Sequence, residues 1–127
     1  MIILRPFTNL LSFLTMPLIN VRISSSNVTN ANLLLKELSN QLASSTGKPE
    51  KYVMCLLQTE VPMTFSGSDD PCCYVEIKSI GSLQPSQMTE SFCSLIESKT
   101  GIPSNRIYVN FEDVDATKWG YDRQTFG

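Results

Sequence analysis

The feature of this 127-residue chain that most constrains its fold is an internal repeat with a period of about 55 residues. Each copy begins with an alternating strand pattern, continues with a helical pattern and ends with a second strand pattern. Both predicted helices end at the same signal, a glycine followed two residues later by a proline, at residues 47–49 and 101–103. Glycine tolerates the left-handed helix cap, and proline prevents the helix from continuing. The repeat therefore predicts a duplicated β-α-β unit.

Apolar side chains recur in each copy with the period of the element predicted there. Alternating positions predict strands, and a spacing of three to four residues predicts helices. In the first copy these are Ile19, Val21 and Ile23, then Ala31, Leu34, Leu35, Leu38 and Leu42; in the second they are Cys73, Val75 and Ile77, then Met88, Phe92, Leu95 and Ile96, then Ile107, Val109 and Phe111. The remaining strand, residues 52–57, is a nearly continuous apolar run, which is typical of a strand covered on both faces.

Two such units predict an α+β domain, with a four-stranded mixed sheet and two helices on one face of it. No third long helical pattern is present to cover the other face of the sheet. We therefore expect oligomerisation to cover this second face of the sheet. Along the chain, we expect an N-terminal extension over residues 1–16 and the folded domain over residues 17–127.

Composition excludes several classes of function. The net charge of −2 and the lack of a basic cluster argue against a nucleic-acid partner. The apolar run at the N-terminus is shorter than the about 20 residues that a membrane-spanning helix needs, so no membrane association is expected. The chain has no histidine, which removes the commonest general base and metal ligand. Catalysis at neutral pH would therefore need another titratable group.

The four cysteines predict packing roles rather than redox or metal-binding roles. Cys72 and Cys73 are adjacent, while Cys55 and Cys93 lie among apolar residues. Their spacing matches neither a zinc site nor a Cys-x-x-Cys motif. Free cysteines of this kind behave as small apolar side chains and indicate a reducing compartment.

The dipeptide of Met16 and Pro17 stands immediately before the first predicted strand. A proline nitrogen in a peptide bond is not basic, whereas an N-terminal proline is a secondary amine that can act as a general base. Pro17 acquires that amine only if everything before it is absent or removed. Without such removal, Pro17 is an ordinary proline that opens a strand.

The segment before Met16 has three open explanations. Residues 1–15 contain no acidic residue, and the apolar groups are interrupted by Pro6 and Asn9. Translation that begins at Met16, a removable targeting segment and a retained extension all fit this pattern. No hydrophobic stretch followed by a small-residue cleavage site marks a secretory signal. We therefore expect a cytoplasmic protein, with export by an unconventional route or organelle targeting through residues 1–15 as the alternatives.

A series of short motifs runs through the chain from Met16 onward. In order they are Met16-Pro17, Thr46-Gly47-Lys48-Pro49, Tyr52, Phe65-Ser66-Gly67, Ser79-Ile80-Gly81, Arg106-Ile107-Tyr108-Val109-Asn110, Trp119-Gly120-Tyr121 and Thr125-Phe126-Gly127. In this order and spacing they resemble the macrophage migration inhibitory factor and D-dopachrome tautomerase family, within the tautomerase superfamily. None of these motifs is specific alone.

The resemblance implies a homotrimer with three active sites at the subunit boundaries and Pro17 at the base of each. It implies keto–enol tautomerisation of an α-keto acid such as phenylpyruvate, or of dopachrome derivatives, without a metal or an organic cofactor. Elementary chemistry agrees with a catalytic role for Pro17, because burial and a nearby cation both lower the pKa of an amine. Such an amine is unprotonated often enough near neutral pH to remove a proton from carbon beside a carbonyl.

The resemblance also implies the substrate-binding residues. The substrate carboxylate would be held by Lys48 and the backbone N–H of Ile80, the neighbouring subunit would supply Tyr108 and Asn110, and the apolar walls would be Tyr52 and Phe126. A carboxylate paired with a lysine fixes the orientation of the substrate. Taken alone, a lysine beside a helix end is also explained by the helix dipole, so the sequence leaves that alternative open.

A second class of function stays open beside the enzyme. It is a cytokine-like or other interaction protein, in which the pocket is residual and a receptor or another protein is the partner. The resembled mammalian cytokines carry a Cys-x-x-Cys motif, whereas this chain reads Cys72-Cys73-Tyr74-Val75 there. A thiol oxidoreductase activity is therefore not expected.

Overall fold

The structure is a computed structural model that describes residues 16–26 and 28–127. The predicted extension before Met16 lies outside the described residues. The long elements are β1 (Pro17–Ile23), α2 (Ala31–Thr46), β2 (Met54–Gln58), β3 (Cys73–Ser79), α3 (Pro85–Thr100) and β4 (Ile107–Asp113). The short elements are the 3-10 helices η1 (Glu50–Tyr52), η2 (Ser104–Arg106) and η3 (Ala116–Lys118), and the strands β5 (Gly120–Tyr121) and β6 (Gln124–Thr125).

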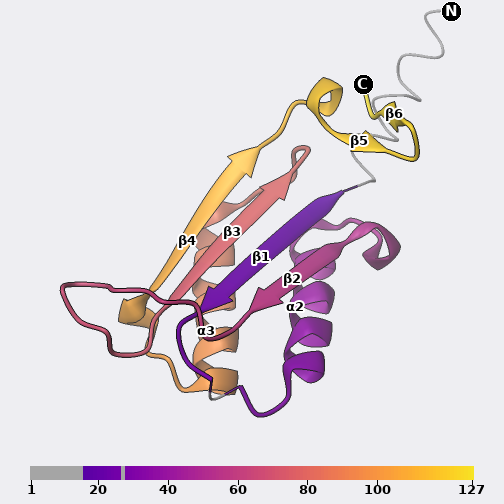
Figure 1. Cartoon of the computed structure of the whole chain (residues 1–127). Helices are drawn as coiled ribbons and strands as arrows, with labels where there is room; N and C mark the ends of the chain where they lie inside the picture. Colours follow the sequence, from indigo (N-terminus) through magenta and orange to yellow (C-terminus); the bar gives the residue numbers. More distant parts are fainter. Residues whose placement is uncertain (1–15, 27) are drawn as a thin grey trace, which may run out of the picture.

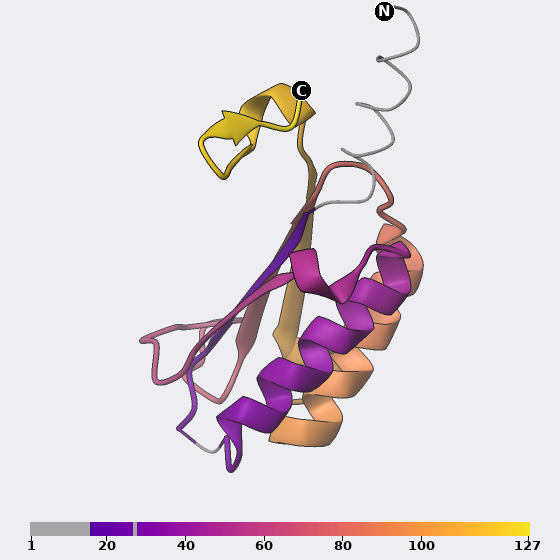
Figure 2. The same ribbon diagram turned by 90° about the vertical axis from the view of Figure 1, so that its right-hand side faces the viewer.

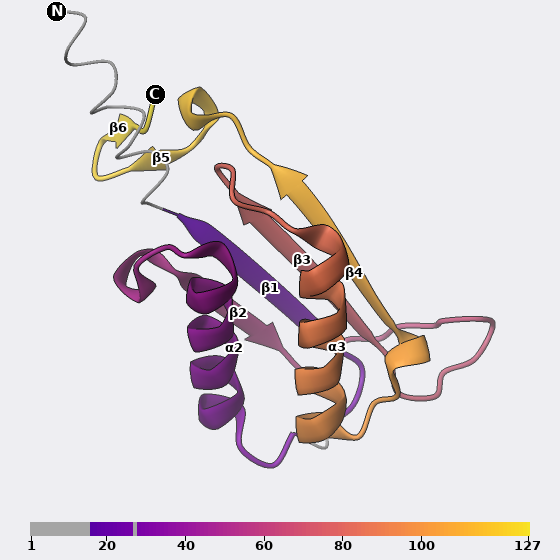
Figure 3. The same ribbon diagram turned by 180° about the vertical axis from the view of Figure 1, so that it is seen from behind.

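The four long strands form one mixed sheet in the order β2-β1-β3-β4. β1 pairs with β2 and β3 pairs with β4 in parallel, as expected inside each β-α-β unit. β1 and β3 pair antiparallel to each other, and this pairing joins the two units at the centre of the sheet. Both helices cover the same face (Figures 1 to 3). The predicted α+β class, the duplication and the one-sided helix layer are thus confirmed.

Each long helix begins and ends where local chemistry predicts. The side chain of Asn30 accepts a hydrogen bond from the backbone N–H of Leu33 at 3.0 Å and so caps the start of α2. Pro85 occupies the first turn of α3, where its missing N–H costs nothing. Gly47 and Gly101 end the two helices with φ of 71° and 77°, which favours glycine.

The core lies between the sheet and the two helices. Its fully enclosed residues include Ile19, Leu38, Ile77 and Phe92. All four cysteines are free, and Cys73 and Cys93 belong to this core. Burial raises the pKa of the Cys55 thiol to about 11 and that of Cys73 to about 12, so these thiols are protonated at neutral pH. The expected packing role of the cysteines is confirmed by these positions.

The expectation that the apolar run at residues 52–57 is covered on both faces is wrong for the single chain. β2 is an edge strand, and its side chains alternate between exposed and half-buried. Met54 and Leu56 are 55% and 41% exposed, while Cys55 and Leu57 pack against the core. An apolar run shows that both faces of a strand can be buried, but it does not supply the second layer. Here no second layer covers this face of β2 among the residues that the structure describes.

The C-terminal segment adds a two-stranded sheet that the sequence patterns did not predict. β5 and β6 pair in antiparallel and lie beyond the end of the main sheet at which β1 begins (Figures 1 and 3). Strands of two residues are too short for alternation to be detectable.

None of the helices in the described residues is long and apolar enough to span a bilayer.

Candidate active site

The site is built around a row of three residues on adjacent strands. Pro17 of β1 lies opposite Ser79 of β3, and Ser79 lies opposite Asp113 of β4. Alternate residues of a strand share a face, so Pro17 and Ser79 lie on the helix-covered face with the core residues of β1 and β3. Pro17 is buried, and Ser79 has no exposed surface. The row thus places a hydroxyl group beside the proline.

Lys48 is brought to this row by the end of α2. It directly follows the left-handed Gly47 cap and is only 4% exposed. Its ammonium group donates hydrogen bonds to the carbonyl oxygens of Ile80 at 2.7 Å and of Met16 at 3.1 Å. The Met16 carbonyl belongs to the peptide bond that includes the Pro17 nitrogen. The structure therefore places the Lys48 cation beside the predicted base.

The Met16 carbonyl has a second donor. The Ser79 hydroxyl donates to the same oxygen at 3.3 Å. Two buried donors that converge on one oxygen define an oxygen-binding position next to the Pro17 nitrogen. Sequence reasoning included Ser79 in a motif but gave it no role at the site.

The charge of Lys48 is set by opposing effects. Burial lowers the pKa of its ammonium group to about 8, and the negative charge of Asp113 acts in the opposite direction. Lys48 is therefore mainly a cation at pH 7 and loses its proton as the pH rises through about 8. A carboxylate ligand would favour the charged form.

Three aromatic residues form one cluster near the same end of the sheet. Tyr52 of η1 packs edge-on against Tyr121 of β5, with ring centroids 6.4 Å apart. Tyr121 stacks on Phe126 at 5.8 Å with 6° between the ring planes. Tyr52 and Phe126 were predicted as apolar walls, and the structure joins them through Tyr121. The hairpin of β5 and β6, which no pattern predicted, is what positions this cluster.

Two predicted site residues lie away from Pro17 in the single chain. Tyr108 is 64% exposed and points, like Asn110, to the sheet face that the helices do not cover. Tyr108 precedes Asp113 by five residues along β4, which corresponds to about 16 Å of extended strand. One chain therefore cannot bring Tyr108 to its own Pro17. The expectation that both residues enter the site of a neighbouring subunit stays a prediction.

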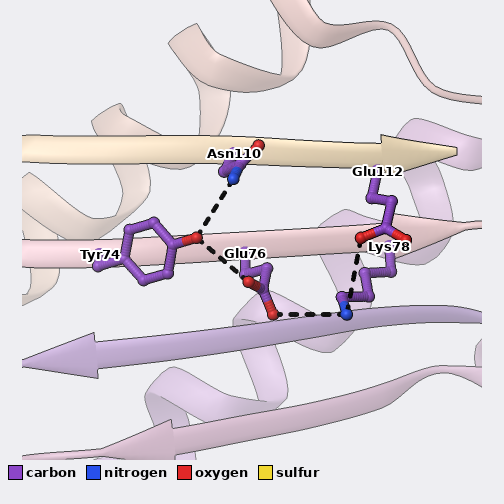
Figure 4. Close-up of polar contacts among 5 residues, drawn as sticks. All are labelled: Tyr74, Glu76, Lys78, Asn110 and Glu112. Atoms are coloured by element: carbon purple, nitrogen blue, oxygen red, sulfur yellow. Dashed lines mark hydrogen bonds and ion pairs between the residues drawn. The ribbon is translucent and has the colours of Figure 1, made fainter.

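The uncovered sheet face carries a polar network (Figure 4). The Asn110 amide donates to the Tyr74 hydroxyl at 3.3 Å, and that hydroxyl donates to Glu76 at 3.2 Å. Lys78 lies 3.9 Å from Glu76 and 3.7 Å from Glu112. Asn110 is thus oriented by its own sheet before any partner is considered.

Tyr108 is supported by a loop that Arg106 holds. The guanidinium group donates to four backbone carbonyls between residues 65 and 71, at 2.8 to 3.3 Å. It also lies 5.3 Å from the centroid of the Phe65 ring, and that ring packs edge-on against Tyr108 at 4.7 Å. Arg106 therefore determines the position of the ring that supports Tyr108.

Replacing Arg106 with lysine should lower the free energy of unfolding by about 1–3 kcal/mol, because a lysine cannot form the four-fold set of hydrogen bonds. Urea unfolding followed by circular dichroism measures the change. Arg22→Lys, at an exposed position of β1, is the matched control and should be close to neutral. An Arg106→Lys protein as stable as that control would contradict the role of this contact.

Sequence reasoning gave Asp113 no role at the site, and it did not join Tyr121 to Tyr52 and Phe126. Asp113 could have been found from the repeat, because equivalent strand ends lie side by side in a sheet of this topology. The family resemblance puts Tyr121 at the rim of the pocket, but only the hairpin places it between Tyr52 and Phe126. Among the residues that the structure describes, no group of three or more side chains is arranged to hold a metal ion.

Comparison with known proteins gives one consistent result. The family model described as macrophage migration inhibitory factor (MIF) matches residues 16–127. Curated relatives of that name are 32% identical over 114 residues in Xenopus laevis, with 87% of this chain and 99% of the relative covered, and 36% identical over 112 residues in Meriones unguiculatus, with 86% and 96% covered.

Solved structures agree with these matches. A crystal structure of a macrophage migration inhibitory factor homologue from Prochlorococcus marinus has a TM-score of 0.82 and 55% identity, covering 87% of this chain and 99% of the homologue. The crystal structure of a macrophage migration inhibitory factor-like protein from Entamoeba histolytica has a TM-score of 0.79 and 28% identity, covering 86% of this chain and 97% of that protein.

Proposed function

Because this chain belongs to the macrophage migration inhibitory factor family, we propose that it is a keto–enol tautomerase in which the amine of Pro17 is the general base. The observation that carries the proposal is the contact of Lys48 with the Met16 carbonyl at 3.1 Å. A cation that reaches the acyl group on the Pro17 nitrogen also reaches a substrate bound at that nitrogen.

The proposed substrate is an α-keto acid such as phenylpyruvate. Its carboxylate pairs with the Lys48 ammonium and the backbone N–H of Ile80, and its aromatic ring lies along the cluster of Tyr52, Tyr121 and Phe126. The Pro17 amine removes a proton from the carbon beside the keto group, and the C–H electron pair forms the carbon–carbon double bond. The C=O π electron pair moves onto the keto oxygen, and the protonated Pro17 amine gives its proton to that oxygen, which yields the enol and restores the free amine. The reverse direction uses the same groups, and no redox step occurs.

The reaction requires a chain that begins at Pro17. In the chain with Met16 attached, the Pro17 nitrogen is an amide, and the Met16 carbonyl occupies donors of Lys48 and Ser79. All described helices, strands and core residues lie within residues 17–127. The family match begins at Met16, and the relatives named above are covered over 96% and 99% of their own length. A domain that begins at Pro17 therefore contains every helix, strand and core residue that the structure describes.

The proposed active assembly is a homotrimer. The exposed Met54, Leu56 and Tyr108 lie on the sheet face that no described element covers, and a second copy of the chain would cover it. The same arrangement would let Tyr108 and Asn110 complete the site of a neighbour. We place the protein in the cytoplasm, in line with its free cysteines.

The direct test is a phenylpyruvate tautomerisation assay on protein that begins at Pro17, with the first residue verified by intact mass. We expect turnover without an added metal or cofactor. A folded protein of verified mass that shows no turnover would contradict the enzyme and leave the cytokine-like interaction protein as the alternative.

Replacing Lys48 with methionine should raise KM for phenylpyruvate about 10- to 100-fold, because a charge-assisted contact to the carboxylate is lost. The change in kcat should be smaller. In the unsubstituted protein that begins at Pro17, called the parent below, kcat/KM should fall as the pH rises through about 8. The reason is that Lys48 is charged below its pKa and neutral above it. Lys36→Met, at an exposed position of α2, is the matched control. Equal KM values for the two variants would rule out Lys48 as the anchor.

A further inference from the structure

The turn that follows β3 is held by contacts from two other elements. Lys48 donates to the carbonyl of Ile80 at 2.7 Å. The backbone N–H of Gly81 donates to Oδ1 of Asp113 at 2.9 Å. The Ile80 carbonyl and the Gly81 N–H belong to one peptide group, so Lys48 and Asp113 hold the two ends of the same peptide. The position of the Lys48 ammonium therefore depends on Asp113 through the peptide group that both residues contact.

Asp113 is placed for this contact by strand pairing. Ser79 lies opposite Asp113 in the register of β3 and β4, and the backbone N–H of Val114 donates to the Ser79 carbonyl at 2.8 Å. These contacts keep the end of β4 beside the turn. Asp113 lies an even number of residues after the helix-facing residues of β4 and therefore shares their side of the strand, whereas Glu112 points to the uncovered face.

The turn needs such support because its backbone is unusual. Gly81 has φ of 73°, and Ser82 has φ of 62°. A left-handed conformation at a residue other than glycine costs of the order of 1 kcal/mol and persists only where surrounding contacts enforce it. The hydrogen bond from Gly81 to Asp113 is one such contact.

We propose that Asp113 is a positioning residue of the active site: its carboxylate holds the turn at Ile80 and Gly81 and supplies the negative charge that keeps the Lys48 anchor cationic. This inference rests on the tautomerase function proposed above. It assigns to Asp113 a role in substrate binding that acts through Lys48 and not through contact with the substrate.

The surrounding charges favour this assignment. Burial lowers the pKa of Lys48, and Asp113 is the charged group that raises it. Around Lys48, β1 contributes the Pro17 nitrogen, which becomes an amine once Met16 is removed, and β3 contributes the Ser79 hydroxyl. The groove beside Asp113 also contains further charged side chains, namely Lys78, Glu112, Asp115 and Lys118. Glu112 is paired with Lys78 on the opposite sheet face.

Three variants of the chain that begins at Pro17 test the proposal. Asp113→Asn keeps an oxygen that can accept from Gly81 but removes the charge. Asp113→Ala removes both. Glu112→Gln removes one charge from the adjacent residue on the other face and is the matched control. Each variant is measured by the NMR titration of the Lys48 side chain, and by kcat and KM for phenylpyruvate at pH 6 and pH 8.

We expect the Lys48 titration of Asp113→Asn to move to lower pH than in the parent and in Glu112→Gln. Its KM should rise about 3- to 10-fold at pH 8 and return toward the parent value at pH 6, where Lys48 is protonated in every variant. Asp113→Ala should raise KM about tenfold at both pH values, because the turn is also released. In both variants kcat should change less than KM.

Two results would overturn the proposal. One is a Lys48 titration in Asp113→Asn that coincides with the one in Glu112→Gln. The other is a folded Asp113→Ala protein with the parent KM at both pH values. If Asp113→Ala does not fold, the asparagine variant still decides. If the parent has no tautomerase activity, the proposed function fails, while the NMR titration still shows whether Asp113 controls the charge of Lys48.

Discussion

Replacing Pro17 with glycine, in a chain that begins at this residue, should lower kcat/KM for phenylpyruvate tautomerisation about 100-fold or more. The glycine variant keeps an amine but loses the secondary amine and the rigid ring of proline. Pro17 is buried at the start of β1, so its ring holds the nitrogen in one position. A glycine at the same place is conformationally free and presents a weaker, less oriented base.

Steady-state kinetics over a range of pH separates this effect from a loss of structure. If Pro17 is the base, the acidic limb of kcat/KM moves in the variant, because the titrating amine is a different one. The alkaline limb, which we assign to Lys48, should stay near pH 8. Pro103→Gly, at the exposed cap of η2, is the control for the general effect of losing a proline. Equal kcat/KM values in the Pro17→Gly and parent proteins would exclude Pro17 as the base.

Retaining Met16, alone or with residues 1–15, should reduce activity at least about 1,000-fold, because two requirements fail together. The lone pair of an amide nitrogen is delocalised into its carbonyl, so Pro17 is not basic. The Met16 carbonyl also accepts hydrogen bonds from Lys48 and Ser79 and so occupies the oxygen-binding position. Substrate would therefore meet neither a base nor an available oxygen position.

Intact mass and activity must be measured on the same preparation. Residual turnover in a chain that keeps Met16 should scale with the mass fraction that begins at Pro17. Circular dichroism and urea unfolding serve as the control, since the elements and core are the same in both chains. A preparation with only the intact 127-residue mass and the full kcat/KM would contradict the requirement for a free proline amine.

Much of the fold was predictable because its signals are local. Apolar periodicity predicted the elements from Ile19 to Phe111, and Gly47 and Gly101 ended the helices where the structure has them. The apolar run of β2 did not reveal that one face stays open within the described residues, where Met54 and Leu56 are exposed. Cover by a second copy stays a prediction. The hairpin of β5 and β6 was not predicted, because its strands are two residues long.

The candidate site was predictable in its residues but not in its contacts. The motifs indicated Pro17, Lys48 and Ile80. No pattern in the sequence shows that the Lys48 ammonium donates to the carbonyls of both Met16 and Ile80. Tyr108 and Asn110 carry no signal for the face on which they act, beyond their alternation along the strand. Their predicted place in a neighbouring subunit depends on an assembly that one chain does not contain.

The sequence by itself determined the duplicated β-α-β plan, the one-sided apolar pattern and the dependence of any Pro17 chemistry on a free amine. These follow from periodicity and from the chemistry of the proline nitrogen, which are local properties. Only the tertiary structure decided that Lys48 and Ser79 meet at the start of β1, with Asp113 beside Ser79 on the next strand. Their approach depends on strand order and register, and their electrostatics depend on burial. Both are properties of the packed chain and not of any one segment.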